Sequence, residues 1–198
     1  MSSKLILYGD SNTYGYDPRG MLGMRYPEEI RWTTIVSGAL SGRYDVVPKG
    51  MNGRELPYLP GDESIIAGLT KELKEKDIFL IMLGTNDILL TNRPNASVPI
   101  NKMEKVLQWI KSENGLFSTV VIGPPFIADM GGDMRAYHDE SRRMNDGFEK
   151  LCPEYGVNYI DAAAWDVPLA FDGVHIAEEG QRIFAERLLE SLERKELK

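Results

Sequence analysis

The sequence predicts a doubly wound α/β fold, and two observations carry that prediction. Short apolar runs of strand length alternate with segments of helical periodicity, the order expected for a parallel sheet with helices on both faces. The runs are apolar at nearly every position rather than at every second one, as in strands that are covered on both sides. Because 198 residues suffice for one core, we expect residues 1–198 to form a single domain.

The expected elements alternate along the whole chain. The apolar runs predict strands at residues 5–8, 44–47, 78–83, 120–122 and 157–160. The helical patterns lie at residues 27–40, 64–74, 101–112, 134–152 and 177–192. Gly156 stands between a helical pattern and a strand, as a C-terminal cap does. Glu178 and Glu179 suit the N-terminus of the last helix, because acidic side chains interact favourably with the helix dipole there.

Composition excludes several classes of function. The 23 Lys and Arg against 30 Asp and Glu give a net charge of -7, which argues against a large face for nucleic acid or an anionic membrane. The single cysteine, Cys152, excludes an internal disulfide framework and a multi-thiolate metal site, and we expect it to be structural. No apolar stretch reaches the length of a membrane span or of a secretory signal. We therefore expect a cytoplasmic protein that binds neither nucleic acid nor membrane.

A serine follows the first expected strand directly, in Gly9-Asp10-Ser11. A buried strand that ends in this way places the Ser11 hydroxyl at its carboxyl tip, where open α/β sheets hold their functional sites. Ser11 is therefore the candidate nucleophile. The alternative is an ordinary turn, since glycine, aspartate and serine are also common turn and helix-cap residues.

Two further polar positions follow the second and third expected strands, namely Gly53 and Asn86. If the strand order is the common 2-1-3-4-5, the first strand lies between the other two, and Ser11, Gly53 and Asn86 share one edge of the sheet. A glycine amide can approach a substrate closely, and an asparagine amide is an uncharged donor. With the amide of Ser11 they would form an oxyanion hole. Taken singly, Gly53 also fits a turn and Asn86 a helix-capping loop.

A serine nucleophile needs a general base, and the chain has 2 histidines. His175 lies between the last strand and the last helix, three residues after Asp172. That spacing lets the carboxylate accept a hydrogen bond from Nδ1 and leaves Nε2 for Ser11. The alternative is that both residues only cap the final helix. His138 lies in a charged helical segment and is expected to be a surface residue.

Four blocks of sequence together resemble the SGNH hydrolases, also called the GDSL esterase/lipase family. They are Gly9-Asp10-Ser11, the segment around Gly53, Gly84-Thr85-Asn86-Asp87 and Asp172-Gly173-Val174-His175. Residues 31–33, 50–54 and 81–87 look more narrowly like the arylesterase-like branch of small bacterial enzymes.

The resemblance implies a role for each candidate residue. Ser11 would be the nucleophile, His175 the general base and Asp172 its orienting partner, while the Ser11 amide, Gly53 and Asn86 would hold the oxyanion. It also implies a flavodoxin-like three-layer αβα sandwich with a five-stranded parallel sheet, and neither a metal ion nor an organic cofactor.

Two positions depart from the pattern of the family. Asn12 stands where the family name records a leucine, which predicts a more polar pocket floor. Glu55 stands where the arylesterase-like enzymes tend to carry threonine, which leaves the acyl and alcohol preference open.

The irregular stretches 12–26 and 123–133 both follow strands and are expected to wall the pocket, with mobile surface loops as the alternative. The polar and aromatic side chains at its entrance predict a short acyl group; they belong to Asn12, Tyr14, Tyr16 and Arg54. Of these, Asn12, Tyr14 and Arg54 are expected to contact substrate.

We therefore expect a serine esterase that hydrolyses short-chain carboxylic esters, with acetyl esters of carbohydrates as one candidate class. A thioesterase or lysophospholipase of the same family is an alternative. A non-catalytic module that binds an anion or nucleotide is another, although residues 9–15 lack the lysine of a phosphate loop and the G-x-G-x-x-G spacing. Self-association through Trp32, Tyr58 or Leu59 stays open, since aromatic residues on helix faces more often belong to a core.

Overall fold

The computed structural model describes residues 2–20, 24–112 and 119–194. Its centre is a five-stranded sheet in which neighbouring strands pair in parallel, in the order β2-β1-β3-β4-β5. The strands are β1 (Ser3–Gly9), β2 (Tyr44–Gly50), β3 (Ile78–Met82), β4 (Thr119–Gly123) and β5 (Asn158–Asp161). The predicted fold class and strand order are therefore confirmed.

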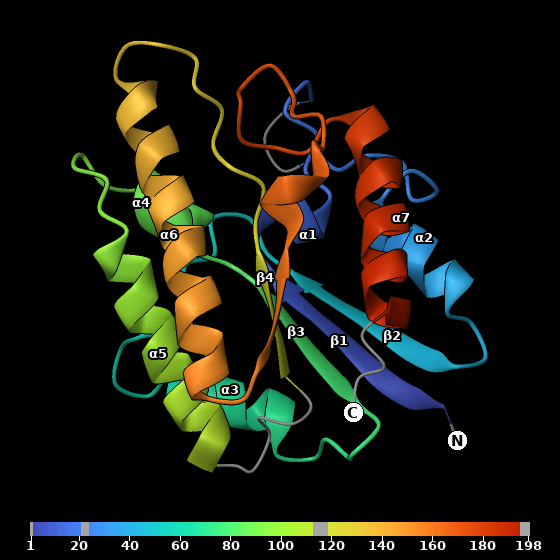
Figure 1. Cartoon of the computed structure of the whole chain (residues 1–198). Coiled ribbons are helices and arrows are strands. Elements are labelled where there is room, and N and C mark those ends of the chain that lie inside the picture. Colours follow the sequence, from blue (N-terminus) through green and yellow to red (C-terminus); the bar gives the residue numbers. More distant parts are fainter. Residues whose placement is uncertain (1, 21–23, 113–118, 195–198) are drawn as a thin grey trace.

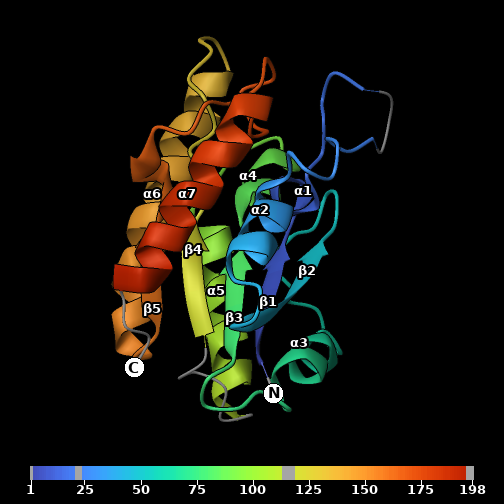
Figure 2. The same ribbon diagram turned by 90° about the vertical axis from the view of Figure 1, so that its right-hand side faces the viewer.

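Helices cover both faces of this sheet (Figure 1). They are α1 (Ser11–Tyr14), α2 (Trp32–Ala39), α3 (Glu63–Thr70), α4 (Thr85–Leu89), α5 (Ser97–Ser112), α6 (Met134–Glu154) and α7 (Glu178–Arg194), with the 3-10 helix η2 (Ala162–Trp165) after β5. Helices α2 and α7 lie on one face, toward the viewer in Figure 2, and α3, α5 and α6 lie on the other. Within the part of the chain that the structure describes, no helix is long and apolar enough to cross a membrane.

The two faces of the sheet bury two separate apolar clusters. Leu5 and Leu7 of β1 pack in one cluster with Trp32 and Phe184 of the α2 and α7 layer. The alternate residue Ile6 packs on the opposite face, in the cluster that α3, α5 and α6 complete. Successive side chains of a strand point to opposite faces, so a sheet covered on both sides needs an apolar residue at every position. This is why the strands appear in the sequence as continuous apolar runs.

Three element boundaries differ from the prediction for identifiable reasons. Strand β2 continues past residue 47 through Pro48 to Gly50, because an edge strand tolerates a residue without an N–H donor. Helix α2 begins at Trp32 rather than at residue 27, since residues 27–31 form turns. Helix α5 begins earlier than expected, at Ser97, with a proline in its first turn, where the missing N–H breaks no helical bond.

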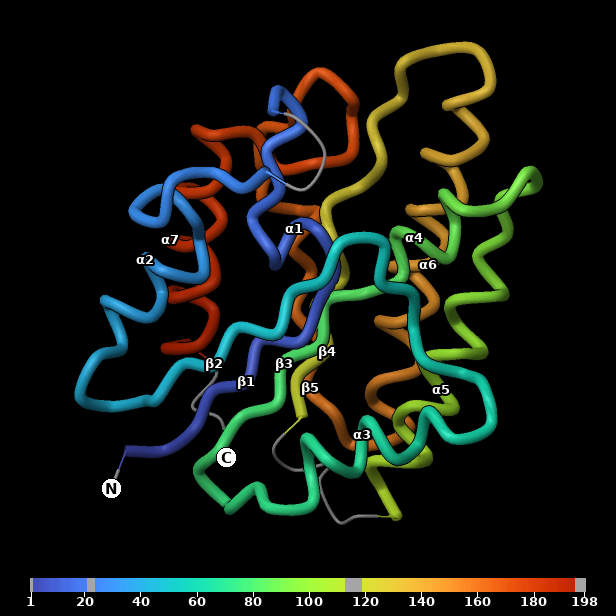
Figure 3. Tube along the Cα trace, turned by 180° about the vertical axis from the view of Figure 1, so that it is seen from behind, coloured from blue at the N-terminus to red at the C-terminus, as the bar shows by residue number. Residues whose placement is uncertain are grey.

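Two very short α-helices of the described residues were not predicted, and both carry candidate residues. Helix α1 follows β1 after a single residue, and α4 begins three residues after β3 ends. They lie beyond the carboxyl ends of adjacent strands (Figure 3). Helices of four and five residues are too short to show a helical period in sequence.

Trp32 belongs to the core and not to a surface contact. Its side chain is 0% exposed, and its indole Nε1 donates a hydrogen bond of 2.8 Å to the Asn12 carbonyl. Tyr58 and Leu59 are exposed. Of the three residues considered for self-association, these two stay available.

The backbone of α1 rests directly on Gly50 at the end of β2. A Cβ added at Gly50 would lie 2.2 Å from the amide nitrogen of Tyr14 and 2.5 Å from the carbonyl carbon of Thr13. Backbone atoms cannot rotate away, so we expect Gly50→Ala to destabilise the fold by about 1–3 kcal/mol and to lower Tm by about 2–10 °C. Gly38 of α2 is the matched control, because a Cβ there meets nothing within 4 Å and alanine favours helix. A thermal melt in which Gly50→Ala is as stable as Gly38→Ala would contradict this packing.

Candidate active site

Ser11 lies in the sharp turn between β1 and α1. Asp10 caps α1, since its Oδ1 accepts a hydrogen bond of 2.9 Å from the Asn12 amide, and Gly15 ends the helix with φ at 81°. Ser11 is the first residue of α1. The N–H of a first helical residue has no acceptor within its own helix, so both the hydroxyl and the amide of Ser11 can serve at the carboxyl end of the sheet.

The structure brings the three predicted catalytic residues into one hydrogen-bonded chain. The Ser11 Oγ lies 3.0 Å from His175 Nε2, and His175 Nδ1 lies 2.6 Å from Asp172 Oδ2. The other carboxylate oxygen, Oδ1, accepts hydrogen bonds of 3.0 Å from the backbone amides of Val174 and His175. With Nδ1 donating to the carboxylate, Nε2 is left as an acceptor for the serine proton, the arrangement in which an imidazole acts as a general base.

The same hydrogen bonds keep Asp172 ionised. Partial burial pushes the pKa of Asp172 upward, but the hydrogen bonds from the His175 ring and from the His175 and Val174 amides outweigh burial and hold the pKa below its usual value. Asp172 is therefore an anion throughout the neutral range and stabilises a proton on His175.

Gly53 and Asn86 lie on two segments that follow β2 and β3 at the carboxyl end of the sheet and are joined by a hydrogen bond. Gly53 has φ at 70°, within a turn closed by the Arg54 amide on the Met51 carbonyl. Asn86, in the first turn of α4, donates a hydrogen bond of 3.0 Å from Nδ2 to the carbonyl of Arg54. One side-chain N–H of Asn86 thus fixes the loop that carries Gly53, and an asparagine amide has a second N–H for another acceptor.

A buried ion pair behind Asn86 was not predicted. Asp87 Oδ1 lies 2.7 Å from Lys102 Nζ, and its Oδ2 accepts a hydrogen bond of 3.0 Å from the Leu56 amide. Lys102 also pairs with Glu55 at 2.7 Å. Burial raises the pKa of Asp87, and the bonds from Lys102 and Leu56 oppose that rise. The pair joins α4 to α5, and the bonds to Leu56 and Glu55 fix both helices to the loop after Gly53. Its only signal in the sequence is the position of Asp87 directly after Asn86.

The three residues predicted to bind substrate have other partners. Both polar atoms of the Asn12 side chain bond to the backbone beside His175. Arg54 donates from Nη1 to the carbonyls of Gly9, at 2.7 Å, and Lys49, and its guanidinium lies over the Tyr8 ring. Tyr14 is half-buried with the guanidinium of Arg25 over its ring. Both polar atoms of the Asn12 side chain and the Nη1 of Arg54 are thus bonded within the protein, and contact of these three residues with substrate stays a prediction.

The two irregular stretches do reach the loop that carries His175. The ring of Tyr16 packs against the His175 ring with centroids 4.7 Å apart. In the second stretch, the Ala128 amide donates a hydrogen bond of 2.8 Å to the Gly173 carbonyl. His138, expected at the surface, is half-buried, and its Nδ1 lies 2.7 Å from the Ile127 carbonyl. It therefore holds the second stretch in place.

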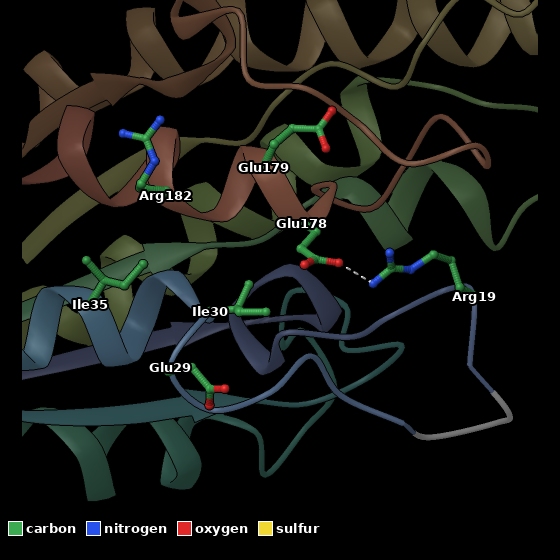
Figure 4. A pocket seen from close by; sticks show the side chains of 7 residues that line it. All are labelled: Arg19, Glu29, Ile30, Ile35, Glu178, Glu179 and Arg182. Atoms are coloured by element: carbon green, nitrogen blue, oxygen red, sulfur yellow. Dashed lines mark hydrogen bonds and ion pairs between the residues drawn. The ribbon is translucent and has the colours of Figure 1, made fainter.

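A separate hollow of about 430 Å³ lies between the loop after α1 and the start of α7 (Figure 4). Charged side chains line most of it, and an ion pair of 2.6 Å joins Arg19 to Glu178 at its edge. None of the predicted site residues lines this hollow, so it is distinct from the site at Ser11. Within the described residues, no cluster of three or more His, Cys, Asp or Glu is placed to hold a metal ion.

Asp10 is a buried acid directly behind the nucleophile. Burial raises the pKa of Asp10 to about 6, against opposing contributions from the Asn12 amide and from His175. An acid whose pKa is higher in the folded state than in the unfolded state destabilises the fold once it ionises. We therefore expect the wild type to lose about 3 kcal/mol of stability relative to Asp10→Asn as pH rises from about 4 to about 7, at about 1.4 kcal/mol per pKa unit.

Chemical unfolding of both proteins across this pH range measures the difference. Asparagine keeps the acceptor for the Asn12 amide, so the helix cap survives in the variant. Curves of unfolding free energy that run parallel for the wild type and Asp10→Asn would contradict the expected ionisation of Asp10.

Comparison with known proteins gives a consistent result. The model of the GDSL-like lipase/acylhydrolase family matches residues 7–183. None of the curated proteins searched matches the chain. A carbohydrate acetylesterase from Sinorhizobium meliloti has a similar structure, with a TM-score of 0.80 at 20% identity over 98% of this chain and 99% of that one.

Two further solved structures share the fold. The aryl esterase of M. smegmatis superposes with a TM-score of 0.80 at 21% identity, over 98% of this chain and 99% of that one. A member of the lipolytic G-D-S-L family from Veillonella parvula DSM 2008 superposes with a TM-score of 0.77 at 21% identity, over 98% of this chain and 100% of that one. Because the family model spans most of the sequence and includes Ser11 and His175, this chain belongs to the GDSL-like lipase/acylhydrolase family of ester hydrolases.

Proposed function

We propose that the protein is a serine esterase that hydrolyses short-chain carboxylic esters through an acyl-Ser11 intermediate. The observation that carries the proposal is the continuous chain from Ser11 Oγ to His175 Nε2, at 3.0 Å, and from His175 Nδ1 to Asp172 Oδ2, at 2.6 Å. A nucleophile within hydrogen-bond reach of a base, with the base oriented by a third group, is the arrangement of nucleophilic catalysis.

In the first half of the reaction, neutral His175 accepts the proton of Ser11 at Nε2 while Ser11 Oγ attacks the ester carbonyl carbon. Asp172 accepts the Nδ1–H and stabilises the imidazolium that forms. The carbonyl oxygen becomes an oxyanion, which the Ser11 amide, the Gly53 amide and Asn86 Nδ2 bind. When the tetrahedral intermediate collapses, His175 returns its proton to the departing alkoxide, and the alcohol leaves.

In the second half, water replaces the alcohol. His175 takes a proton from the water as it attacks the acyl carbon, and the same three donors bind the second oxyanion. Collapse of this intermediate breaks the bond to Ser11 Oγ, which recovers its proton from His175 and releases the carboxylic acid.

Acetyl esters of carbohydrates are the substrate class that we favour. Two proteins of similar fold are described as a carbohydrate acetylesterase and an aryl esterase. The aromatic ring of Tyr16 beside His175 offers a flat face of the kind on which sugar and aryl groups stack.

A series of p-nitrophenyl esters of increasing acyl length, followed by acetylated sugars, tests this assignment. We expect kcat/KM to be highest for the acetate and to fall as the chain lengthens. A maximum at about eight carbons or more would contradict the short-chain assignment, and a preference for thioesters or lysophospholipids would move the protein to another activity of its family.

Removal of the Asn86 side chain is expected to weaken catalysis without preventing binding. Asn86→Ala deletes one oxyanion donor, so kcat should fall by about 10²–10³-fold. Steady-state kinetics on p-nitrophenyl acetate measure this loss. Asn86→Asp accompanies it, because an aspartate keeps the size of the side chain but has no N–H for the oxyanion or for the Arg54 carbonyl; it should lose at least as much kcat. Wild-type kcat in Asn86→Ala would show that the oxyanion lies elsewhere.

A further inference from the structure

We infer that Asn12 is a positioning residue that holds the loop carrying His175 in register with Ser11. The inference rests on the proposed function, in which Ser11 is the nucleophile and His175 its base. It assigns the side chain of Asn12 a role in the alignment of these two residues and none in contact with substrate.

The Asn12 side chain bonds to residues 172–176, which we call the catalytic loop, on both sides of His175. Its Nδ2 donates a hydrogen bond of 3.2 Å to the carbonyl of Val174, and its Oδ1 accepts one of 2.8 Å from the amide of Ile176. Asn12 is 4% exposed, so the bonds do not compete with bulk water. Because Asn12 directly follows Ser11 in α1, one rigid amide fixes the residue beside the nucleophile to the residues on either side of the base.

These bonds belong to a closed circuit of buried hydrogen bonds. The Asn12 carbonyl accepts a hydrogen bond of 2.8 Å from Trp32 Nε1, and the Trp32 amide donates one of 3.1 Å to Gln181 Oε1. Gln181 Nε2 then donates a hydrogen bond of 3.2 Å to the Ile176 carbonyl. The Ile176 amide donates to Asn12 Oδ1, and this bond completes the circuit. All four residues are buried. The circuit joins α1, α2, α7 and the catalytic loop, so the Asn12 amide has one defined orientation.

The two links of the catalytic chain depend on this circuit differently. Asp172 and His175 lie on the same loop and are joined by bonds within it. Ser11 and His175 are 164 residues apart in sequence and lie on different elements, and their 3.0 Å contact depends on how the loop is seated against α1. Loss of the Asn12 amide should therefore disturb the Ser11–His175 contact and leave the Asp172–His175 contact intact.

Kinetics on p-nitrophenyl acetate test the inference with Asn12→Leu, which keeps the size of the side chain and removes both bonds. We expect kcat to fall on the order of 10- to 100-fold, because a displacement of about 1 Å in a reacting group costs about that much. KM should change little. If Asn12→Leu folds poorly, Asn12→Ser is a smaller change that can replace it. This variant should also lower kcat and leave KM nearly unchanged.

Asn145 provides the matched control. It is another buried asparagine, and its Nδ2 donates a hydrogen bond of 2.9 Å to the Pro124 carbonyl just after β4 and not to the loop that carries His175. Asn145→Leu should lose stability, as Asn12→Leu does, and keep kcat near that of the wild type. Equal losses of kcat in the two variants would overturn the inference. So would a loss of kcat/KM in Asn12→Leu that comes from a higher KM with kcat unchanged.

A second measurement does not depend on turnover. The chain has 2 histidines, so ¹⁵N spectra of the imidazole rings can be assigned with His138→Gln. In Asn12→Leu we expect the Nε2 signal of His175 to shift and its Nδ1 signal to stay. An unchanged Nε2 signal would overturn the inference even if no ester were hydrolysed, whereas failure of the wild type to hydrolyse any ester would count against the proposed function alone.

Discussion

Replacement of Ser11 with alanine is expected to lower kcat for p-nitrophenyl acetate by about 10⁶-fold. In serine hydrolases, loss of the nucleophile costs about as much as loss of the whole triad, because the base and its orienting acid act only through the serine oxygen. Here Ser11 Oγ is the atom that lies 3.0 Å from His175 Nε2. The structure should be almost unaffected, since the hydroxyl is deleted at the end of the sheet and not from its core.

The control is Ser64→Ala, which removes an exposed hydroxyl on α3 that donates to the nearby Gly61 carbonyl. It should keep the rate of the wild type, and both variants should melt close to the wild-type temperature. A folded Ser11→Ala that retains a tenth or more of kcat would show that another group attacks the ester.

Asp172→Asn is expected to lower kcat by about 10⁴-fold. An asparagine keeps the size of the side chain but offers its amide to the ring, which favours the tautomer with the proton on Nε2 and removes the acceptor needed by Ser11. The variant also loses the negative charge that the hydrogen bonds from His175 and Val174 maintain in the wild type.

Asp161→Asn is the matched control. Asp161 also accepts a hydrogen bond from a backbone amide two residues later, that of Ala163 at 3.1 Å, and lies at the end of β5 outside the catalytic loop. It should retain wild-type kcat. A loss of less than about tenfold in Asp172→Asn would mean that another acceptor orients His175.

The strands and their order could be predicted because the sheet is covered on both sides. Continuous burial of Leu5, Ile6 and Leu7 requires continuous apolar sequence. The meeting of Ser11, Asp172 and His175 could be predicted because the loops after parallel strands all begin at the same edge of the sheet. Asp172 and His175 needed only a local argument, since three residues in a tight turn bring the carboxylate to the ring.

The hydrogen-bond partners of Asn12 and Arg54 could not be predicted in this way. Both are polar residues close to Ser11, which made them candidates for contact with substrate. Most of their hydrogen-bond partners in the structure are backbone atoms of distant segments, such as the Val174 carbonyl 162 residues from Asn12 and the Gly9 carbonyl 45 residues from Arg54, and no local pattern encodes a backbone acceptor. The same is true of Gln181, which looks in the sequence like any polar residue on the first turn of a helix and is fully buried in the structure.

The most direct test of the proposed mechanism is detection of the acyl-enzyme. The protein is mixed with p-nitrophenyl acetate, quenched in acid within the first turnover, digested and analysed by mass spectrometry. We expect an acetyl group on the peptide that contains Ser11, absent from Ser11→Ala. Hydrolysis of the ester at the wild-type rate with the acetyl group on another residue, or with no adduct in any quench, would contradict the mechanism.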